Sequence, residues 1–345
     1  MPALFESGFF VREPAWHGEG IVLDDYPGRE EAMKLAGHDF QVVERPVFVV
    51  GKDIDADKAR EQGTYVAHPD GFNGVKMDVP FKALVKSGTG EVFTIVNDTY
   101  EVIQNSVAYD VAELLFEQGF QYETGITLDG GALCALTLKL DEPITLPGDD
   151  SPVLPFGCLS WSHNGTASLR VRSGTIRQVC ANTVSASEAE GKRLGTDFTF
   201  RHTKNVHDRI EEAKAAVQGV REGFDIYREA MMELVNLPVT PEQRDMFVST
   251  IIGDKGGLLS TNEATSNRVK NNIESERAKV NALFFGPTIP EAHHLTAYGL
   301  HLAGVEYFDH LRGYRSHDSY VKRTLLSDNP AKANLIRTIR EVVAA

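Results

Sequence analysis

Residues 81–97 read FKALVKSGTGEVFTIVN, and this stretch sets the expected fold. Two runs rich in β-branched and aromatic residues, Phe81 to Lys86 and Glu91 to Asn97, flank the short glycine-containing segment Ser87 to Gly90. Such a pattern is typical of two antiparallel strands joined by a tight loop. We therefore expect a β-hairpin here and assign the other elements outward from it.

A helix is expected directly after the hairpin, from Ser106 to Glu117. Its apolar residues recur at helical spacing, and Gly119 suits the position just beyond a helix end. More strands follow, separated by glycine-containing turns, at Ala132 to Leu140, Leu154 to Ser162, Ser168 to Arg172 and Thr175 to Cys180. The order β-β-α-β-β-β favours an α+β fold, in which an antiparallel sheet carries a packed helix on one face.

The regions before and after this middle part show different patterns of apolar residues. Upstream, the pattern predicts a short helix from Glu30 to Ala36 and a strand from Gln41 to Val50. Downstream, apolar residues from Val206 to Met231 recur in steps of three and four, which predicts a long amphipathic helix. We interpret its apolar stripe as packing against the sheet or a neighbouring helix, with a seam between protomers as the alternative.

A mainly helical region is expected to complete the chain. Further helices are predicted at Pro241 to Ile252, Asn262 to Phe285, Pro290 to Leu311 and Pro330 to Val343. The predicted organisation is an α+β core domain over residues 1–202 and a helical region over residues 203–345. The second region would pack on the first or on a neighbouring protomer.

Composition narrows the class of protein. The 345 residues carry a net charge of −14, which argues against a surface that coats duplex DNA. There is no apolar run of about 20 residues, as a membrane span requires, and the start lacks signal-peptide features, so a cytoplasmic protein is expected. Cys134, Cys158 and Cys180 have no paired spacing and are expected to be buried thiols.

Motifs for catalysis are missing from the sequence. The histidines form no H-E-x-x-H, the glycines near Lys255 do not follow the phosphate-loop order, and there is no G-x-S-x-G elbow. Paired acidic residues such as Asp149 and Asp150 are expected in turns or on solvated faces. No catalytic residue, cofactor or metal site is therefore predicted, and an enzyme is the less favoured class.

A basic segment is the most informative feature. Residues 160–210 hold eight Lys and Arg against four Asp and Glu, within an acidic chain. Arg170 and Arg172 are two apart on an expected strand, so both project to one face while Leu169 and Val171 project to the other. Guanidinium groups neutralise phosphates, and flat rings accept stacked bases. The predicted nucleic-acid-binding residues are Arg170, Arg172, Arg177, Arg201, Lys204, Trp161 and His163, with Phe198, Phe200 and His202 as further rings.

Five stretches carry a family resemblance that spans almost the whole chain. They are Arg12–Gly18, Val96–Tyr100 continuing to Gln104-Asn105, Arg177–Thr183, Arg201–Val206 and Glu306–His310. In these stretches the chain resembles the uncharacterised phage/plasmid-like protein family, domain of unknown function 932. The resemblance implies a setting in bacteriophages, prophages or plasmids, and hence in the cytoplasm of the bacterial host. It implies no assigned activity.

The order of elements in the middle region carries a second resemblance. It is similar to the β-β-β-α core of single-strand annealing proteins, the Rad-fifty-two-like superfamily that includes phage recombinases. Those proteins form rings or filaments whose groove holds single-stranded DNA by its backbone, without nucleotide hydrolysis. The resemblance implies a homo-oligomeric protein that binds and anneals single-stranded DNA in recombination.

Two other functions are kept as alternatives. One is a phage enzyme that modifies nucleic acid, with Trp16, His17, Asp98, Cys180 and Asn182 converging on a pocket. The other is a structural or interaction protein that binds a host factor through its acidic surface and its long helix.

Overall fold

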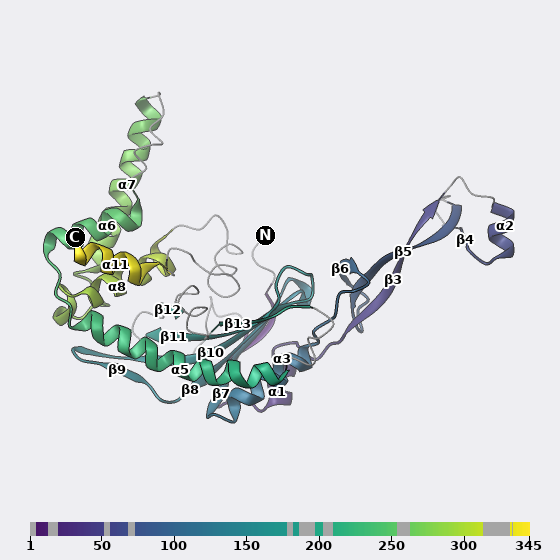
Figure 1. Cartoon of the computed structure of the whole chain (residues 1–345), viewed down its shortest axis with the longest axis horizontal. Coiled ribbons are helices and arrows are strands. Elements are labelled where there is room, and N and C mark those ends of the chain that lie inside the picture. Colours follow the sequence, from purple (N-terminus) through teal and green to yellow (C-terminus); the bar gives the residue numbers. More distant parts are fainter. Residues whose placement is uncertain are drawn as a thin grey trace.

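The computed structural model describes residues 5–12, 20–51, 56–67, 73–177, 182–185, 197–202, 210–253, 263–312, 332 and 334–345. It confirms the α+β class, with helices concentrated in the C-terminal part. Figure 1 shows a body that contains one sheet and most of the helices, and a narrow second sheet that projects from it.

The main sheet has the strand order β12-β11-β10-β8-β7-β1-β2, with β13 beside β11 and β9 beside β10. All neighbours are antiparallel except β1 and β2, which are parallel. The strands are β1 (Phe5–Val11), β2 (Ile21–Leu23), β7 (Phe120–Leu128), β8 (Leu133–Leu140), β9 (Ile144–Leu146), β10 (Asp149–Ser162), β11 (Leu169–Arg177), β12 (Asn182–Ser185) and β13 (Asp197–Phe200).

The second sheet, here called the arm, covers residues 42–97. It contains β3 (Val42–Gly51), β4 (Tyr65–Ala67), β5 (Asn73–Lys86) and β6 (Val92–Asn97), with the short helix α2 (Ala56–Glu61) at its far end. The expected hairpin is confirmed, because β5 pairs with β6. However, it does not join the sheet formed by the later strands. The N-terminal strand β1 takes the place beside β7 instead.

Three helices cover one face of the main sheet: α1 (Arg29–Leu35), α3 (Asn105–Phe116) and α5 (Ile210–Val235). The described apolar residues along α5 are buried against the sheet and the neighbouring helices, as the packing interpretation predicted. They are Ala213, Val217, Val220, Phe224, Tyr227 and Met231. The stripe therefore belongs to the core of the chain.

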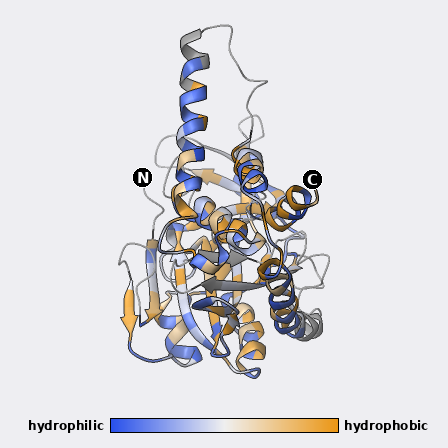
Figure 2. Cartoon of the chain, turned by 90° about the vertical axis from the view of Figure 1, so that its left-hand side faces the viewer, coloured by the Kyte–Doolittle hydropathy of each residue, from blue (hydrophilic) through white to orange (hydrophobic). Residues whose placement is uncertain are grey.

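The remaining helices form a cluster at one end of the body: α6 (Pro241–Ile252), α7 (Glu263–Leu283), the 3-10 turn η3 (Glu291–His293), α8 (Ala297–Glu306), the π-turn η4 (Tyr307–Leu311) and α11 (Leu335–Ala344). Thr240 and Gln243 form a capping box that fixes the start of α6 where the sequence predicts it. The helix expected from Pro290 begins later, at Ala297, because Thr296 caps it. Figure 2 shows that α7 projects from the body and is largely hydrophilic.

A further predicted boundary is wrong. Ser173 and Gly174 were expected to form a turn between two strands, but β11 runs unbroken through both. Gly174 pairs with Phe156 on β10 and with Ser185 on β12. A Cβ atom at Gly174 would lie 3.3 Å from the Sγ of Cys158, so the glycine allows close packing on the sheet surface.

None of the helices in the described ranges combines the length and the apolar character that a membrane crossing requires.

Candidate nucleic-acid interface

Arg170 and Arg172 lie on the same face of β11, as their spacing predicts. Arg170 is opposite Ser160 on β10 and Thr199 on β13, and Arg172 is opposite Cys158 on β10. Both arginines are half-buried. We call this side of the main sheet the arginine face.

The opposite face of β11 belongs to the core. Leu169 is 1% exposed and Val171 is fully buried, and both belong to the apolar cluster that includes α5. Cys158, on the arginine face beside Arg172, is half-buried, and burial raises the pKa of its thiol to about 11 although Arg172 opposes the shift. A thiol of this kind stays protonated at neutral pH and is a weak nucleophile.

The other predicted cations are distributed unevenly. Arg201 is exposed and directly follows Phe200, which pairs with Leu169, so it lies at the same end of β11 as Arg170. Arg177 lies seven residues beyond Arg170, about 23 Å along the strand, so it does not join this group. Lys204 and the side chain of Arg177 lie outside the described residues. Among the predicted cations whose side chains the structure describes, Arg170, Arg172 and Arg201 lie at the same end of β11.

Trp161 and His163 were predicted as stacking platforms, and their burial contradicts that role. Trp161 is fully buried and His163 is 1% exposed. Both donate to one acceptor, the side-chain oxygen of Asn105 in the first turn of α3, at 2.8 Å each. Neither ring can receive a base without opening the core. Phe198 and Phe200 also pack in the core rather than on the surface.

Asn105 is the centre of this buried network. Besides the two bonds to its oxygen, its amide nitrogen donates to the backbone carbonyls of His38 at 3.0 Å and Phe40 at 3.2 Å. All four hydrogen-bonding positions of the amide are filled. Asn105 therefore ties α3 to β10 and to the segment that leads into β3.

His38 adds two further contacts to this buried network. Its Nε2 lies 3.0 Å from the carbonyl oxygen of Ile126, which can accept but not donate, so Nε2 carries the hydrogen and Nδ1 accepts from the Tyr109 hydroxyl. Burial lowers the pKa of His38 to about 4, although the bond to Ile126 opposes the shift. Burial lowers the pKa of His163 to about 3, with a smaller contribution from His38. Both rings are neutral at physiological pH.

Gln104, the residue before Asn105, holds the base of the arm. Its side-chain oxygen accepts from the amide of Val42 at 2.9 Å, and its side-chain nitrogen donates to the carbonyl of Val42 at 2.8 Å. The side chain thus pairs with the first residue of β3 as a neighbouring strand would. The stretch from Val96 to Asn105 was noted for its family resemblance, but sequence reasoning assigned no role to this pair.

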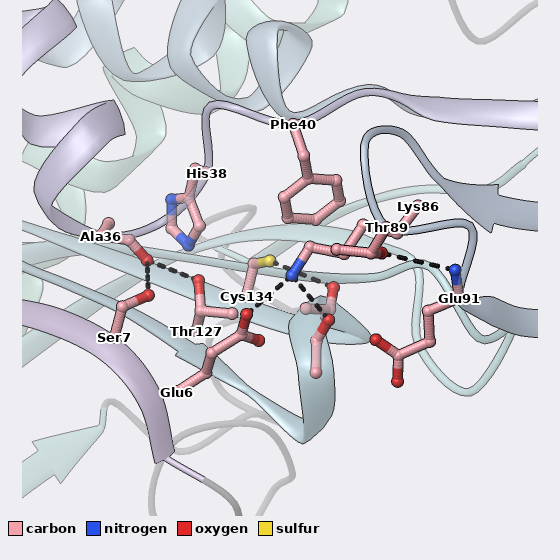
Figure 3. A network of polar contacts seen from close by, with 12 residues as sticks. Glu6, Ser7, Ala36, His38, Phe40, Lys86, Thr89, Glu91, Thr127 and Cys134 are labelled. Atoms are coloured by element: carbon pink, nitrogen blue, oxygen red, sulfur yellow. Dashed lines mark hydrogen bonds and ion pairs between the residues drawn. The ribbon is translucent and has the colours of Figure 1, made fainter.

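Lys86 makes a second connection between the arm and the body (Figure 3). It is 9% exposed at the end of β5, and its Nζ lies 2.7 Å from Oε1 of Glu6 on β1 and 3.0 Å from the carbonyl oxygen of Gly130. The ammonium group also lies 4.8 Å from the centre of the Phe40 ring. A buried lysine needs such partners, so this contact fixes how the arm leaves the body.

The described residues do not form the pocket that the alternative of a nucleic-acid-modifying enzyme predicts. Asp98 follows the last strand of the arm, whereas Asn182 begins β12 at the far edge of the main sheet. Trp16, His17 and Cys180 lie outside the described residues. Within the described ranges, no three His, Cys, Asp or Glu side chains gather as a metal site would require.

Comparison with known proteins gives a family but no activity. Neither a curated protein nor a solved structure matches the chain. The family described as "Domain of unknown function (DUF932)" matches residues 92–327, which run from β6 of the arm through the arginine face and into the helical cluster, ending before α11. Since this match covers more than half of the chain, the protein belongs to the DUF932 family.

Proposed function

We propose that this protein binds and anneals single-stranded DNA in recombination, as a homo-oligomer encoded by a phage and acting in the cytoplasm of its bacterial host. The observation that carries the proposal is the placement of Arg170 and Arg172 on the sheet face opposite the one that α5 covers, with Arg201 at the same end. Guanidinium groups bind phosphates and leave base edges free to pair, which annealing requires. Nucleotide hydrolysis has no part in this mechanism.

The buried rings change the expected mode of binding. Because Trp161 and His163 are enclosed in the core, stacking on them does not contribute, and phosphate contacts supply the affinity. Binding of this kind depends steeply on salt and discriminates weakly between sequences. We therefore expect similar affinity for single strands of different base composition.

The test is a titration of a labelled single strand at several salt concentrations with the variant Arg170→Ala/Arg172→Ala. Each lost phosphate contact should reduce the slope of log K against log salt by about 0.7, so the double variant should lose about 1.4. The matched control is Arg221→Ala/Arg228→Ala, which removes two exposed arginines from α5 on the other side of the sheet. The control should keep the wild-type slope.

Two results would contradict the proposal. One is a wild-type protein that binds no single strand at low salt. The other is an equal loss of affinity in the two double variants, because that would trace binding to net charge rather than to the arginine face. Annealing is then measured with two complementary strands, and the Arg170→Ala/Arg172→Ala variant should slow it.

A further inference from the structure

The arm has one face that is apolar and exposed. Ala83 on β5 is paired with Arg45 on β3 and Ile95 on β6, so these three side chains share a face. Alternation along the strands adds Val43, Phe81 and Val85, and Val92 is paired with Val85; of these, Val85 is only 8% exposed, at the base of the arm. Phe81 is 47% exposed, Ile95 57% and Val92 58%. We call these seven residues the apolar arm face.

At the base of the arm, the other face is covered by the chain itself. Val42 and Leu84 are buried there against Val102, with Val96 and Tyr100 packed beside them. An antiparallel sheet with one packed face normally presents polar side chains to solvent on the other. The apolar arm face departs from this rule, and the exposed pair of Val49 and Met77 continues the exposure toward the far end of the arm. Exposed apolar surface of this extent is typical of an interaction site.

We propose that the apolar arm face packs against the same face of a second copy of this chain. Charge favours this partner. Residues 42–97 hold seven Lys and Arg against eight Asp and Glu, so nearly all of the net charge of −14 lies elsewhere. The apolar arm face has a single charged residue, Arg45. Because the arm projects from the body, two copies joined there keep their acidic bodies apart (Figure 1).

The dimensions of the face indicate how strong this contact is. The apolar arm face covers Phe81 to Val85 on β5, about 17 Å of strand, and three strands span about 14 Å, which gives about 240 Å² for each copy. Two such faces together bury about 480 Å², which is below the roughly 1,000 Å² of a stable specific interface, so we expect a weak, concentration-dependent association. The interface deepens the proposed function by naming the surface used for oligomer formation, but it does not depend on DNA binding.

The test is the mass of the full-length protein by analytical ultracentrifugation without DNA. We expect the wild type to form dimers or larger species, and the variant Phe81→Glu/Ile95→Glu to lose that association, because the charges would be buried. The matched control is Phe285→Glu/Leu295→Glu, which changes two exposed apolar residues, 69% and 48% exposed, in the helical region. The control should keep the wild-type mass.

A milder variant covers the case in which the double glutamate variant does not fold. Ile95→Thr keeps the β-branched shape, and we expect it to weaken self-association about tenfold, since a buried apolar group is replaced by a hydroxyl. A monomeric wild type would overturn the interface, as would arm variants that fold and keep the wild-type mass. Neither result bears on DNA binding, which the salt titration of the Arg170→Ala/Arg172→Ala variant tests separately.

Discussion

The side-chain oxygen of Asn105 lies 2.8 Å from the indole nitrogen of Trp161, and this contact joins the first turn of α3 to the central strand β10. The same oxygen accepts from His163, and the amide nitrogen reaches the backbone of His38 and Phe40. Three parts of the chain that are far apart in sequence therefore meet at one amide.

Replacing Asn105 by alanine should destabilise the fold strongly. Two buried donors and two backbone carbonyls would lose their partner, and each unsatisfied group costs about 1–3 kcal/mol. We expect a loss of about 3 kcal/mol or more in the free energy of unfolding, measured by urea denaturation. The control is Ser106→Ala, an exposed neighbour on the same helix. A loss below about 1 kcal/mol in Asn105→Ala would show that the network contributes little.

Stability should fall between neutral and acidic pH because three histidines are buried in the neutral form. The pKa values of His38 and His301 are lowered to about 4 and that of His163 to about 3, chiefly by burial. Their unfolded values lie near about 6.5, so the unfolded chain takes up protons first. The stabilisation is complete above that pH and is lost as pH falls toward the folded values, at up to about 1.4 kcal/mol per pH unit for each ring.

His301→Leu isolates one of these contributions. Neither ring nitrogen of His301 has a hydrogen-bond partner within the described structure, so an apolar side chain of similar size breaks no bond there. Urea denaturation from about pH 7.5 to 5 should show a shallower loss of stability than in wild type. His310→Gln, at an exposed position, is the control for the removal of an imidazole ring. An unchanged slope in His301→Leu would contradict the prediction.

Lys86→Met should loosen the junction between the arm and the body. The change removes the ion pair to Glu6, whose 39% exposed carboxylate water can solvate, and leaves the carbonyl of Gly130 without this partner, at a cost of about 1 kcal/mol. Hydrogen exchange should become faster at the end of β5 and along β1. Lys82→Met is the matched control on the same strand, because its partner Glu44 is 46% exposed and can be solvated. Equal exchange in the two variants would argue against a special role for Lys86.

Gly125→Ala should disturb the packing of α1 on the sheet. A Cβ atom there would lie 2.6 Å from Cε1 of Phe9 and 2.8 Å from the Cβ of Ala36, closer than atoms can approach. Overpacking of this kind costs about 1–3 kcal/mol. Gly28→Ala is the control, since no atom lies within 4 Å of its added Cβ and its φ is −75°. Equal unfolding midpoints in urea for the two variants would contradict this view of the contact.

Local signals in the sequence predict much of the fold. The hairpin of β5 and β6, the helix α3 and the long helix α5 follow directly from alternation or helical spacing. The start of α6 follows from Thr240, Pro241 and Gln243, which satisfy the first turn of the helix among themselves. Each of these features depends on residues that are close in sequence. The division of the chain at residue 202 stays a prediction.

The assignment of strands to two sheets could not be predicted in this way. It depends on the pairing of β1 with β7, such as Phe10 with Thr124, across more than a hundred residues. The burial of Trp161 could not be predicted from the sequence either. Trp161 and Ser160 point to opposite sides of β10 and both are buried, Ser160 at 4% exposure, so alternation along the strand does not mark an outer side. Arg170 and Arg172 were predicted on one face because their neighbours Leu169 and Val171 do alternate with them.

The hydrogen bonds from Gln104 to Val42 have a mechanical consequence. They fasten the root of β3 to the start of α3, so a tilt of that helix would rotate the arm about its root wherever the contact of Lys86 with Glu6 gives way. For a lever about 33 Å long, a rotation of about 10° displaces the far end by about 6 Å. A movement of α3 over less than the length of a side chain would therefore displace the tip of the arm by more than the distance between two neighbouring strands.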